Sequence, residues 1–508
     1  MHNNSIGTND FFLIAPELSL AVIGLFVLGV GLLGGRKTQA LPAIATFSLL
    51  VPLGLLIMLW NGVDSGHIQS PAGFFGSVII DKFGVFLKVL ILISSGILIL
   101  ASGDYSSRFQ RYQSEFIALL LFSMVGLMIL VSSSDLITLF ISLELASLPI
   151  AALAAFHQED TRSTEAGIKF LLLSALSSAI VLYGFAFIYG GTGTITLYSL
   201  DPAIPTIASS MTQDDSLSFG SYPILIGIIL TLGGLGFKLS IVPFHMWTPD
   251  VYEGSPTPIS AFLAVVSKTA AFALLLRVFY LGFGTSSLDW VPILAVLSAL
   301  SMSVGNLIAI VQRSAKRLLA YSTIAHAGYM LIGVAAINQQ GLTGTLSLLG
   351  ASSVLFYLVS YAAMTLAAFI TLIAVTAKSG SDRIEDFAGL LQRSPLLTVT
   401  ISVALISLTG IPPTAGFIGK LLLFNAAINA GLVWLALLAV INSVVSAYIY
   451  LRIVRIMFMS QPDQSDRLSS ALSVRFLLVV LTVFTFWMGI FPNGIIDLAK
   501  DAALTLLP

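Results

Sequence analysis

Apolar stretches of roughly 20 residues follow one another along almost the whole chain, and no other feature restricts its fold as strongly. About fourteen such stretches are present, and they begin near Phe11, Leu41, Val78, Glu115, Asp135, Gly167, Tyr222, Thr257, Trp290, Leu318, Leu349, Leu397, Leu432 and Phe476. Hydrophobic residues make up 57% of the 508 residues and charged residues only 9%, and the mean hydropathy is +0.99. About a quarter of the residues of a soluble domain are charged. Because no stretch remains for a soluble domain, the sequence predicts an all-α polytopic membrane protein with about fourteen transmembrane helices.

Basic residues fall in alternate connections between these stretches, a pattern typical of cytoplasmic loops. Sixteen of the 23 Lys and Arg residues lie on one side: Arg36, Lys37, Arg108, Arg111, Arg162, Lys169, Arg313, Lys316, Arg317, Lys378, Arg383, Arg393, Arg452, Arg455, Arg467 and Arg475. We expect this side to be cytoplasmic and both termini to lie on the outer side. The opening sequence MHNNSIGTND has no basic segment, which predicts a first spanning helix rather than a cleaved signal peptide.

Four ionisable side chains fall deep inside predicted helices: Glu144, Lys238, Lys268 and Lys420. Each costs about 2.5–3.5 kcal/mol at the centre of a transmembrane helix, so a function or an internal partner is expected. Removal from water disfavours the charged form of an amine, which allows buried lysines to exchange protons near neutral pH. The sequence therefore predicts a proton path.

Two of the predicted helices are interrupted next to a lysine. Pro243 follows Lys238 in GGLGFKLSIVPFHMW, and Pro412 and Pro413 precede Lys420 in LTGIPPTAGFIGKLLLF. A proline inside a helix removes a hydrogen bond and clashes with the preceding turn, and broken helices in corresponding halves mark the ion site of many transporters. The sequence predicts two inverted five-helix repeats, each with a discontinuous helix: residues 114–281 and 282–458, flanked by a three-helix segment at 1–113 and a helix with a tail at 459–508.

Several of these residues have a structural interpretation as well. Glu144 and Lys238 could form a fixed ion pair, although Lys268 and Lys420 have no acidic residue at the same depth to pair with. Lys82 and Lys88 lie near the outer start of the third predicted helix, where their long side chains are expected to reach the lipid headgroups.

The histidines leave two interpretations open. His326, on the tenth predicted helix, titrates near neutral pH and either carries protons between hydrated cavities or packs as a buried side chain. Tyr321 and Ser322, just before it, could hold a file of water. His245 follows the first broken helix and could take up protons or cap the helix end.

Three segments carry a family resemblance: GFKLSIVPFHMWTPDVYEGSPTPISAFLAVVSKTAAF, KRLLAYSTIAHAGYM and LTGIPPTAGFIGKLLLF. They resemble the antiporter-like membrane subunits of respiratory complex I, and most of all the NADH-quinone oxidoreductase subunit N family, called subunit 2 in mitochondria. The resemblance extends from about Asp81 to Ile456.

The resemblance implies roles for individual residues. Glu144 and Lys238 would form the controlling ion pair, Lys268 would be the central connector, and Lys420 the outlet residue. The resemblance also implies that Lys169, His245 and Tyr321 take part in the proton relay. Asp250 and Glu253, in the connection His245–Pro256, are expected to be surface or subunit-contact residues.

The implied function is proton translocation in a membrane subunit of a complex I-type NADH-quinone oxidoreductase, driven by redox chemistry in other subunits. The chain has no cysteine, which excludes cysteine-ligated iron–sulfur clusters on it. It also has no nucleotide-binding glycine loop. NADH, FMN, iron–sulfur clusters and quinone are expected in partner subunits, namely the other membrane subunits and the hydrophilic redox arm. The expected location is an energy-transducing membrane, the bacterial inner or plasma membrane. Two alternatives remain: a subunit of a multisubunit monovalent cation/proton antiporter, and a membrane scaffold that does not pump.

Overall fold

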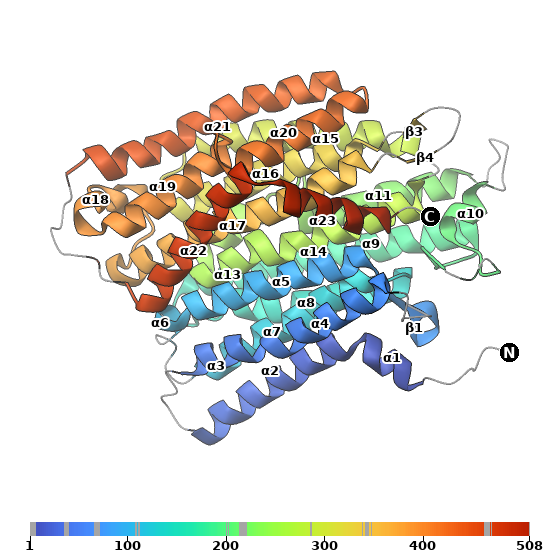
Figure 1. Cartoon of the computed structure of the whole chain (residues 1–508), viewed down its shortest axis with the longest axis horizontal. Coiled ribbons are helices and arrows are strands. Elements are labelled where there is room, and N and C mark those ends of the chain that lie inside the picture. Colours follow the sequence, from blue (N-terminus) through green and yellow to red (C-terminus); the bar gives the residue numbers. More distant parts are fainter. Residues whose placement is uncertain are drawn as a thin grey trace.

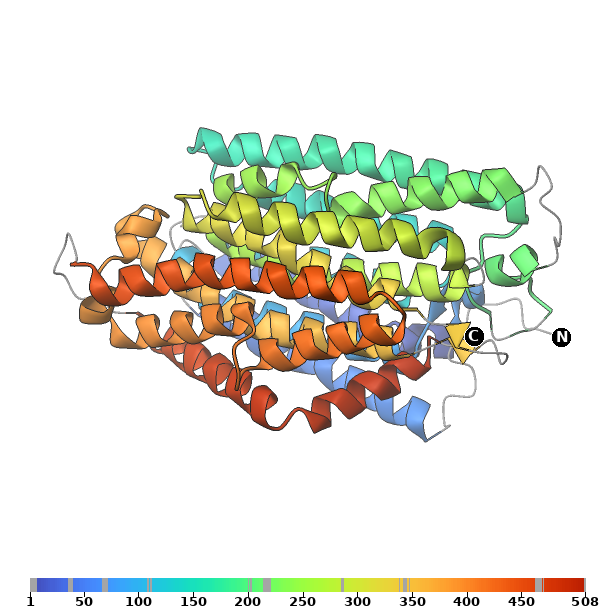
Figure 2. The same cartoon turned by 90° about the horizontal axis from the view of Figure 1, so that it is seen from above.

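The computed structural model describes residues 7–34, 40–65, 72–106, 109, 112–199, 201, 203–212, 221–284, 287–337, 339–340, 345–346, 348–461, 468 and 470–506. Its helices lie side by side along one long axis (Figure 1), and the view from above shows the same alignment (Figure 2). Five basic residues used to predict the topology lie outside the described residues: Arg36, Lys37, Arg108, Arg111 and Arg467.

The N-terminal part contains three spanning segments, and the second packs against the first and the third. Its elements are α1 (Thr8–Leu13), α2 (Ala15–Gly34), α3 (Leu41–Ser48), α4 (Leu50–Asp64), α5 (Lys82–Ala101) and α6 (Gly103–Ser106), with a small hairpin of β1 (Ala72–Gly73), η1 (Phe74–Gly76) and β2 (Val78–Ile79). The helices α3 and α4 together form one apolar span.

The middle of the chain contains the first broken helix. Its elements are α7 (Gln113–Ser132), α8 (Leu136–Ala154), α9 (Thr161–Thr192), α10 (Ile207–Thr212), α11 (Ser221–Leu239), α12 (Trp247–Gly254), α13 (Thr257–Phe262), η3 (Leu263–Ser267), α14 (Lys268–Arg277) and η4 (Val278–Gly282). The last four run on as one span, in which η3 and η4 are π-helical turns. Acidic N-caps begin three of the long helices, because the carboxylates of Asp81, Asp135 and Asp160 accept hydrogen bonds from the first backbone N–H groups of α5, α8 and α9.

The last part contains the second broken helix. Its elements are α15 (Ser287–Ala309), α16 (Ala315–Ala335), β3 (Gln339–Gln340), β4 (Thr345–Leu346), α17 (Leu349–Ser379), η7 (Ile384–Phe387), α18 (Leu390–Arg393), α19 (Pro395–Thr409), α20 (Ala415–Asn429), α21 (Val433–Met459), α22 (Leu472–Ile490) and α23 (Asn493–Leu504). The dark red helices α22 and α23 lie along the outside of the bundle, where α23 packs against α17 and α5 (Figure 1).

The predicted fold class is confirmed. Within the described residues, 13 helical segments are long and apolar enough to cross a membrane, and the shorter pair α19 and α20 supplies the broken helix that completes the expected set. The predicted starts lie within a turn or two of the observed ones. The start of α1 and the end of α23 lie at the same end of the bundle (Figure 1). The opposite end, which includes η7, α18 and the starts of α9 and α16, is called the basic end below, because Arg162, Lys316 and Arg317 lie there.

Both broken helices end in the same way. Ser240 and Gly410 follow α11 and α19 with positive φ angles of 58° and 90°. The next N–H group in each case reaches back to a carbonyl five residues earlier, from Ile241 to Gly236 and from Ile411 to Ile406, which is the hydrogen bond of a Schellman motif. Two related halves would end their broken helices alike. The inverted repeats and the bounds of the four predicted segments stay predictions.

The centre of the bundle is formed by α16, α17 and the span from α13 to η4, whose side chains are almost all buried. Outer helices such as α2 and α4 expose large apolar side chains, among them Val22, Leu25 and Val51. These apolar faces suit lipid or a neighbouring subunit. The polar groups of α14 and α16 lie in the centre of the bundle, away from lipid and from any neighbouring subunit.

Candidate functional site

Lys238 lies one residue before the end of α11, inside the bundle. Its Nζ donates hydrogen bonds to the hydroxyls of Ser147 on α8 and Ser174 on α9, both at 2.6 Å. A cavity of about 20 Å³ lies beside it, lined in part by Ser147, Phe170 and Trp247. That volume holds about one water molecule, which would extend the hydrogen bonding of the amine.

Glu144 lies one turn before Ser147 on α8. Among the described residues it forms no ion pair with Lys238, and its buried Oε1 has no hydrogen-bond partner. It is nevertheless within one helical turn of Ser147, whose hydroxyl accepts a hydrogen bond from the Lys238 amine. The structure therefore places the two members of the expected pair near each other, with Ser147 and Ser174 rather than the carboxylate holding the amine.

Lys268 and Lys420 are placed by the two helix breaks. The Lys268 Nζ donates to the carbonyl of Leu239, the last residue of α11. The Lys420 Nζ donates to the carbonyl of Thr409, the last residue of α19, at 2.8 Å. The last carbonyls of a helix have no partner within it and carry the negative end of its dipole, so each break creates a binding site for one amine.

A second set of contacts surrounds Lys420. Its Nζ also donates to the Ser443 hydroxyl on α21 at 3.2 Å and lies 4.4 Å from the centre of the Tyr329 ring. Ser443 in turn donates to the Tyr329 hydroxyl at 3.3 Å. The amine is thus connected to α16, on which Tyr329 and His326 lie.

His326 is 1% exposed, at the centre of a group of tyrosines. Its Nδ1 lies 2.7 Å from the Tyr357 hydroxyl and its Nε2 lies 3.4 Å from the Tyr450 hydroxyl. The rings of Tyr329 and Tyr361 are also in contact with it. Polar partners on both nitrogens make His326 more than an apolar packing residue.

Tyr321 and His245 are placed differently. Tyr321 is buried on α16, and in the described part of the chain it is not hydrogen bonded to any other predicted relay residue. His245 lies between α11 and α12, half-buried, and its Nδ1 has no hydrogen-bond partner in the described residues. Partial burial lowers the pKa of His245 below its usual value, and the nearby backbone of Pro243 opposes this effect.

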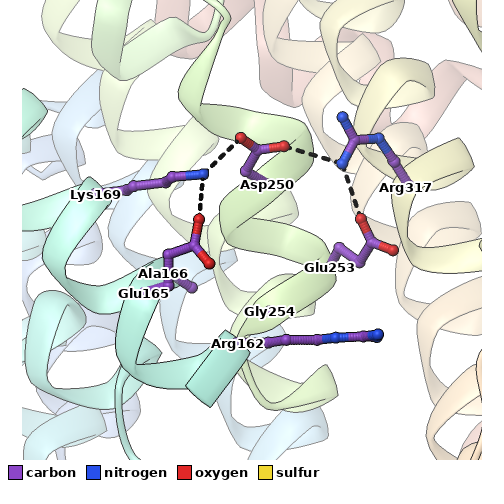
Figure 3. Close-up of a pocket in the computed structure, with 8 residues that line it drawn as sticks. All are labelled: Arg162, Glu165, Ala166, Lys169, Asp250, Glu253, Gly254 and Arg317. Atoms are coloured by element: carbon purple, nitrogen blue, oxygen red, sulfur yellow. Dashed lines mark hydrogen bonds and ion pairs between the residues drawn. The ribbon is translucent and has the colours of Figure 1, made fainter. Parts of the chain in front are cut away.

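Lys169 belongs to a charged pocket at the basic end of the bundle (Figure 3). Its Nζ contacts Glu165 at 2.6 Å and Asp250 at 3.0 Å. Arg317 from α16 contacts Asp250 at 2.9 Å and Glu253 at 2.8 Å. The pocket has a volume of about 230 Å³ and is lined by Arg162, Glu165, Ala166, Lys169, Asp250, Glu253, Gly254 and Arg317. Asp250, on α12, therefore connects α9 to α16.

The structure corrects one expectation about charged residues. Lys88 does not reach the headgroups: it is 0% exposed and its Nζ lies 2.5 Å from Glu17 on α2. Arg277, the last residue of α14, is also buried, with its Nη2 3.0 Å from Asp81 and its Nε donating to the Val131 carbonyl. Glu17 was missed because it stands near the start of an apolar stretch, and nothing in the sequence identifies Lys88 as its partner. By contrast, Lys82 reaches Asp64 near the surface.

Among the described residues, no group of three or more His, Cys, Asp or Glu side chains is placed to hold a metal ion.

Comparison with known protein families gives one match over most of the chain. The family described as "NADH:quinone oxidoreductase/Mrp antiporter, TM" matches residues 133–446. The NADH-quinone oxidoreductase subunit N of Desulforamulus reducens is 40% identical over 501 residues, which cover 98% of this chain and 99% of the relative. The NAD(P)H-quinone oxidoreductase subunit 2 of Synechocystis is 39% identical over 504 residues, covering 97% and 92%.

Solved structures show the same fold. A chain of respiratory complex I from Thermus thermophilus has 33% identity and a TM-score of 0.76, covering 96% of this chain and 99% of that chain. A chain of the Mrp complex from a Dietzia species has 21% identity and a TM-score of 0.81, covering 97% of each. At 21% identity, the second likeness concerns the fold alone.

Proposed function

Because the chain belongs to the NADH:quinone oxidoreductase/Mrp antiporter family of membrane proteins, we propose that it is the proton-translocating subunit N of a complex I-type NADH-quinone oxidoreductase. The observation that carries the proposal is the placement of Lys268 and Lys420, each against the terminal carbonyl of a broken helix. An amine at such a position is held by a dipole rather than by a carboxylate, so it can lose its proton without leaving an unpaired negative charge.

Glu144 would control the release of the proton from Lys238. Two opposite charges 4 Å apart attract each other by about 4 kcal/mol at an effective dielectric of 20. A move of Glu144 onto the Lys238 amine would therefore hold the proton there, and its withdrawal would release the proton towards Lys268. In the present arrangement the Lys238 amine contacts Ser147 and Ser174, which supports a state in which Glu144 is withdrawn from it.

The driving force has to come from outside this chain. Moving one charge against 100 mV requires about 2.3 kcal/mol. NADH oxidation through FMN and iron–sulfur clusters, and quinone reduction, would supply it in partner subunits: the other membrane subunits and the hydrophilic arm. The membrane would be the bacterial inner or plasma membrane, with the basic end cytoplasmic and both termini outside.

A monovalent cation/proton antiporter subunit is the second candidate, because the Mrp chain shares the fold. Purification of the native assembly separates the two. Iron–sulfur subunits that copurify with this chain support the complex I function. Sodium-dependent proton exchange by an assembly without them would support the antiporter.

The relay itself is tested in the purified complex reconstituted into vesicles, with NADH oxidation and proton uptake measured together. We expect Lys238→Ala, Lys268→Ala and Lys420→Ala each to lower the number of protons moved per NADH oxidised, while assembly persists. Lys500→Ala is the matched control, because Lys500 lies exposed on α23 beside Asp497. Unchanged proton transport in all three variants would instead identify the chain as a scaffold.

A further inference from the structure

Both ring nitrogens of His326 face phenol hydroxyls. Nδ1 lies 2.7 Å from Tyr357 on α17, and Nε2 lies 3.4 Å from Tyr450 on α21. A neutral imidazole has one N–H donor and one bare nitrogen. One phenol must therefore donate to the ring while the other accepts from it, and exchanging the tautomer reverses both roles.

On the Tyr450 side, the hydrogen bonds lead towards the basic end of the bundle. The Tyr450 hydroxyl lies 2.5 Å from the Ser322 hydroxyl. Ser322 precedes His326 by one turn of α16, and Arg317 of the charged pocket precedes Ser322 by five residues, or about 7.5 Å of helix rise. Ser322 is therefore the end of this hydroxyl chain that lies nearer to the charged pocket, which is drawn in Figure 3.

On the Tyr357 side, the contacts lead to Lys420. The Tyr357 ring packs against Gly419, where an added Cβ would come within 2.6 Å of the Tyr357 Cδ2. Gly419 directly precedes Lys420 on α20. Because glycine has no side chain, the Tyr357 ring can lie against α20, the helix that carries Lys420.

We propose that Ser322, Tyr450 and Tyr357 are relay residues that connect the charged pocket to Lys420 through His326. This second route joins the pocket to the later half of the chain without passing Lys238. It rests on the proposed function, because it supplies protons to Lys420 as the outlet residue.

Each hydroxyl on the route gains one proton and loses one, and the imidazole ring gains one at Nε2 and loses one at Nδ1. Ser322 gives its hydroxyl proton to the Tyr450 oxygen, and Tyr450 gives its own proton to Nε2. The imidazole releases its Nδ1 proton to the Tyr357 oxygen, and Tyr357 passes its proton by water to the neutral Lys420 amine. Water in the charged pocket restores the Ser322 hydroxyl. The imidazole stays neutral. Rotation of the ring, which carries its proton from the Tyr450 side to the Tyr357 side, restores the starting arrangement before the next proton moves.

The test removes single hydroxyls in the reconstituted complex. Tyr450→Phe and Tyr357→Phe should each lower the number of protons moved per NADH oxidised, because each leaves one ring nitrogen without a relay partner. Tyr448→Phe is the control: Tyr448 lies on the same helix two residues away and is 62% exposed. If Tyr450→Phe does not assemble, Ser322→Ala removes the same link from the other side.

The outcome separates this inference from the function on which it rests. Lys420→Ala is measured in parallel. Loss of proton transport in Lys420→Ala together with normal transport in Tyr450→Phe and Ser322→Ala would overturn the second route and leave the proposed function standing. Normal transport in Lys420→Ala would overturn both. Equal effects of Tyr448→Phe and Tyr450→Phe would also overturn the route, since Tyr448 has no place in it.

Discussion

At the scale of single residues, buried lysines of this bundle differ in whether a carbonyl or a carboxylate holds the amine. Lys268 and Lys420 contact backbone carbonyls at helix ends. Lys88 contacts a carboxylate, that of Glu17, with both side chains almost fully buried. The first arrangement suits transport, whereas the second suits a fixed attachment of α2 to α5.

The attachment can be tested by removing one charge and then both. A buried pair that loses one member leaves an unpaired charge, at a cost of about 3–5 kcal/mol, whereas replacing both members by apolar residues is often neutral. Glu17→Gln or Lys88→Met should therefore prevent stable assembly, and the double variant Glu17→Leu with Lys88→Met should restore it. The readout is the amount of assembled complex in native gels.

The control for this prediction is the Lys82–Asp64 pair, which is partly exposed. Exposed pairs contribute only about 0–1 kcal/mol, so Lys82→Met should assemble normally. A double variant as unstable as either single variant would show that the pair itself is not what attaches α2.

At the scale of elements, the two helix breaks could be predicted from the sequence, but their contacts could not. Pro243, Pro412 and Pro413 identify the breaks, because proline cannot continue a helix. That the carbonyls of Leu239 and Thr409 bind the two lysines depends on how α14 and α20 lie against the breaks. Such long-range geometry leaves no local pattern, and for the same reason the tyrosines around His326 were not anticipated.

Gly410 tests the second break. Its φ of 90° strains any other residue, and an added Cβ would come within 2.9 Å of the Lys420 Cδ. Gly410→Ala should cost about 1–2 kcal/mol of stability and displace the Lys420 side chain. Gly431 has a similar φ of 77° but no atom within contact of an added Cβ. Gly431→Ala should therefore lower the melting temperature comparably and leave proton transport intact, while Gly410→Ala reduces both.

At the scale of the whole molecule, ion pairs in the charged pocket join helices from both halves of the chain. Asp250 connects α9 to α16 through Lys169 and Arg317, and these two helices also carry Ser174 and His326. The helices of both proposed proton routes are therefore connected at this pocket, and a neighbouring subunit that alters the pocket would reach both. The sequence predicted the membrane class and the order of helices, because apolar length alone determines them, whereas the joining of the two halves at Asp250 required the fold.

The most direct test of a proton path through the bundle is an electron cryo-microscopy map of the intact complex in which ordered water is resolved. The account predicts water or hydroxyl contacts without a gap from Lys238 through Lys268 and His326 to Lys420. Dry apolar packing between these amines in every state of the complex would contradict it.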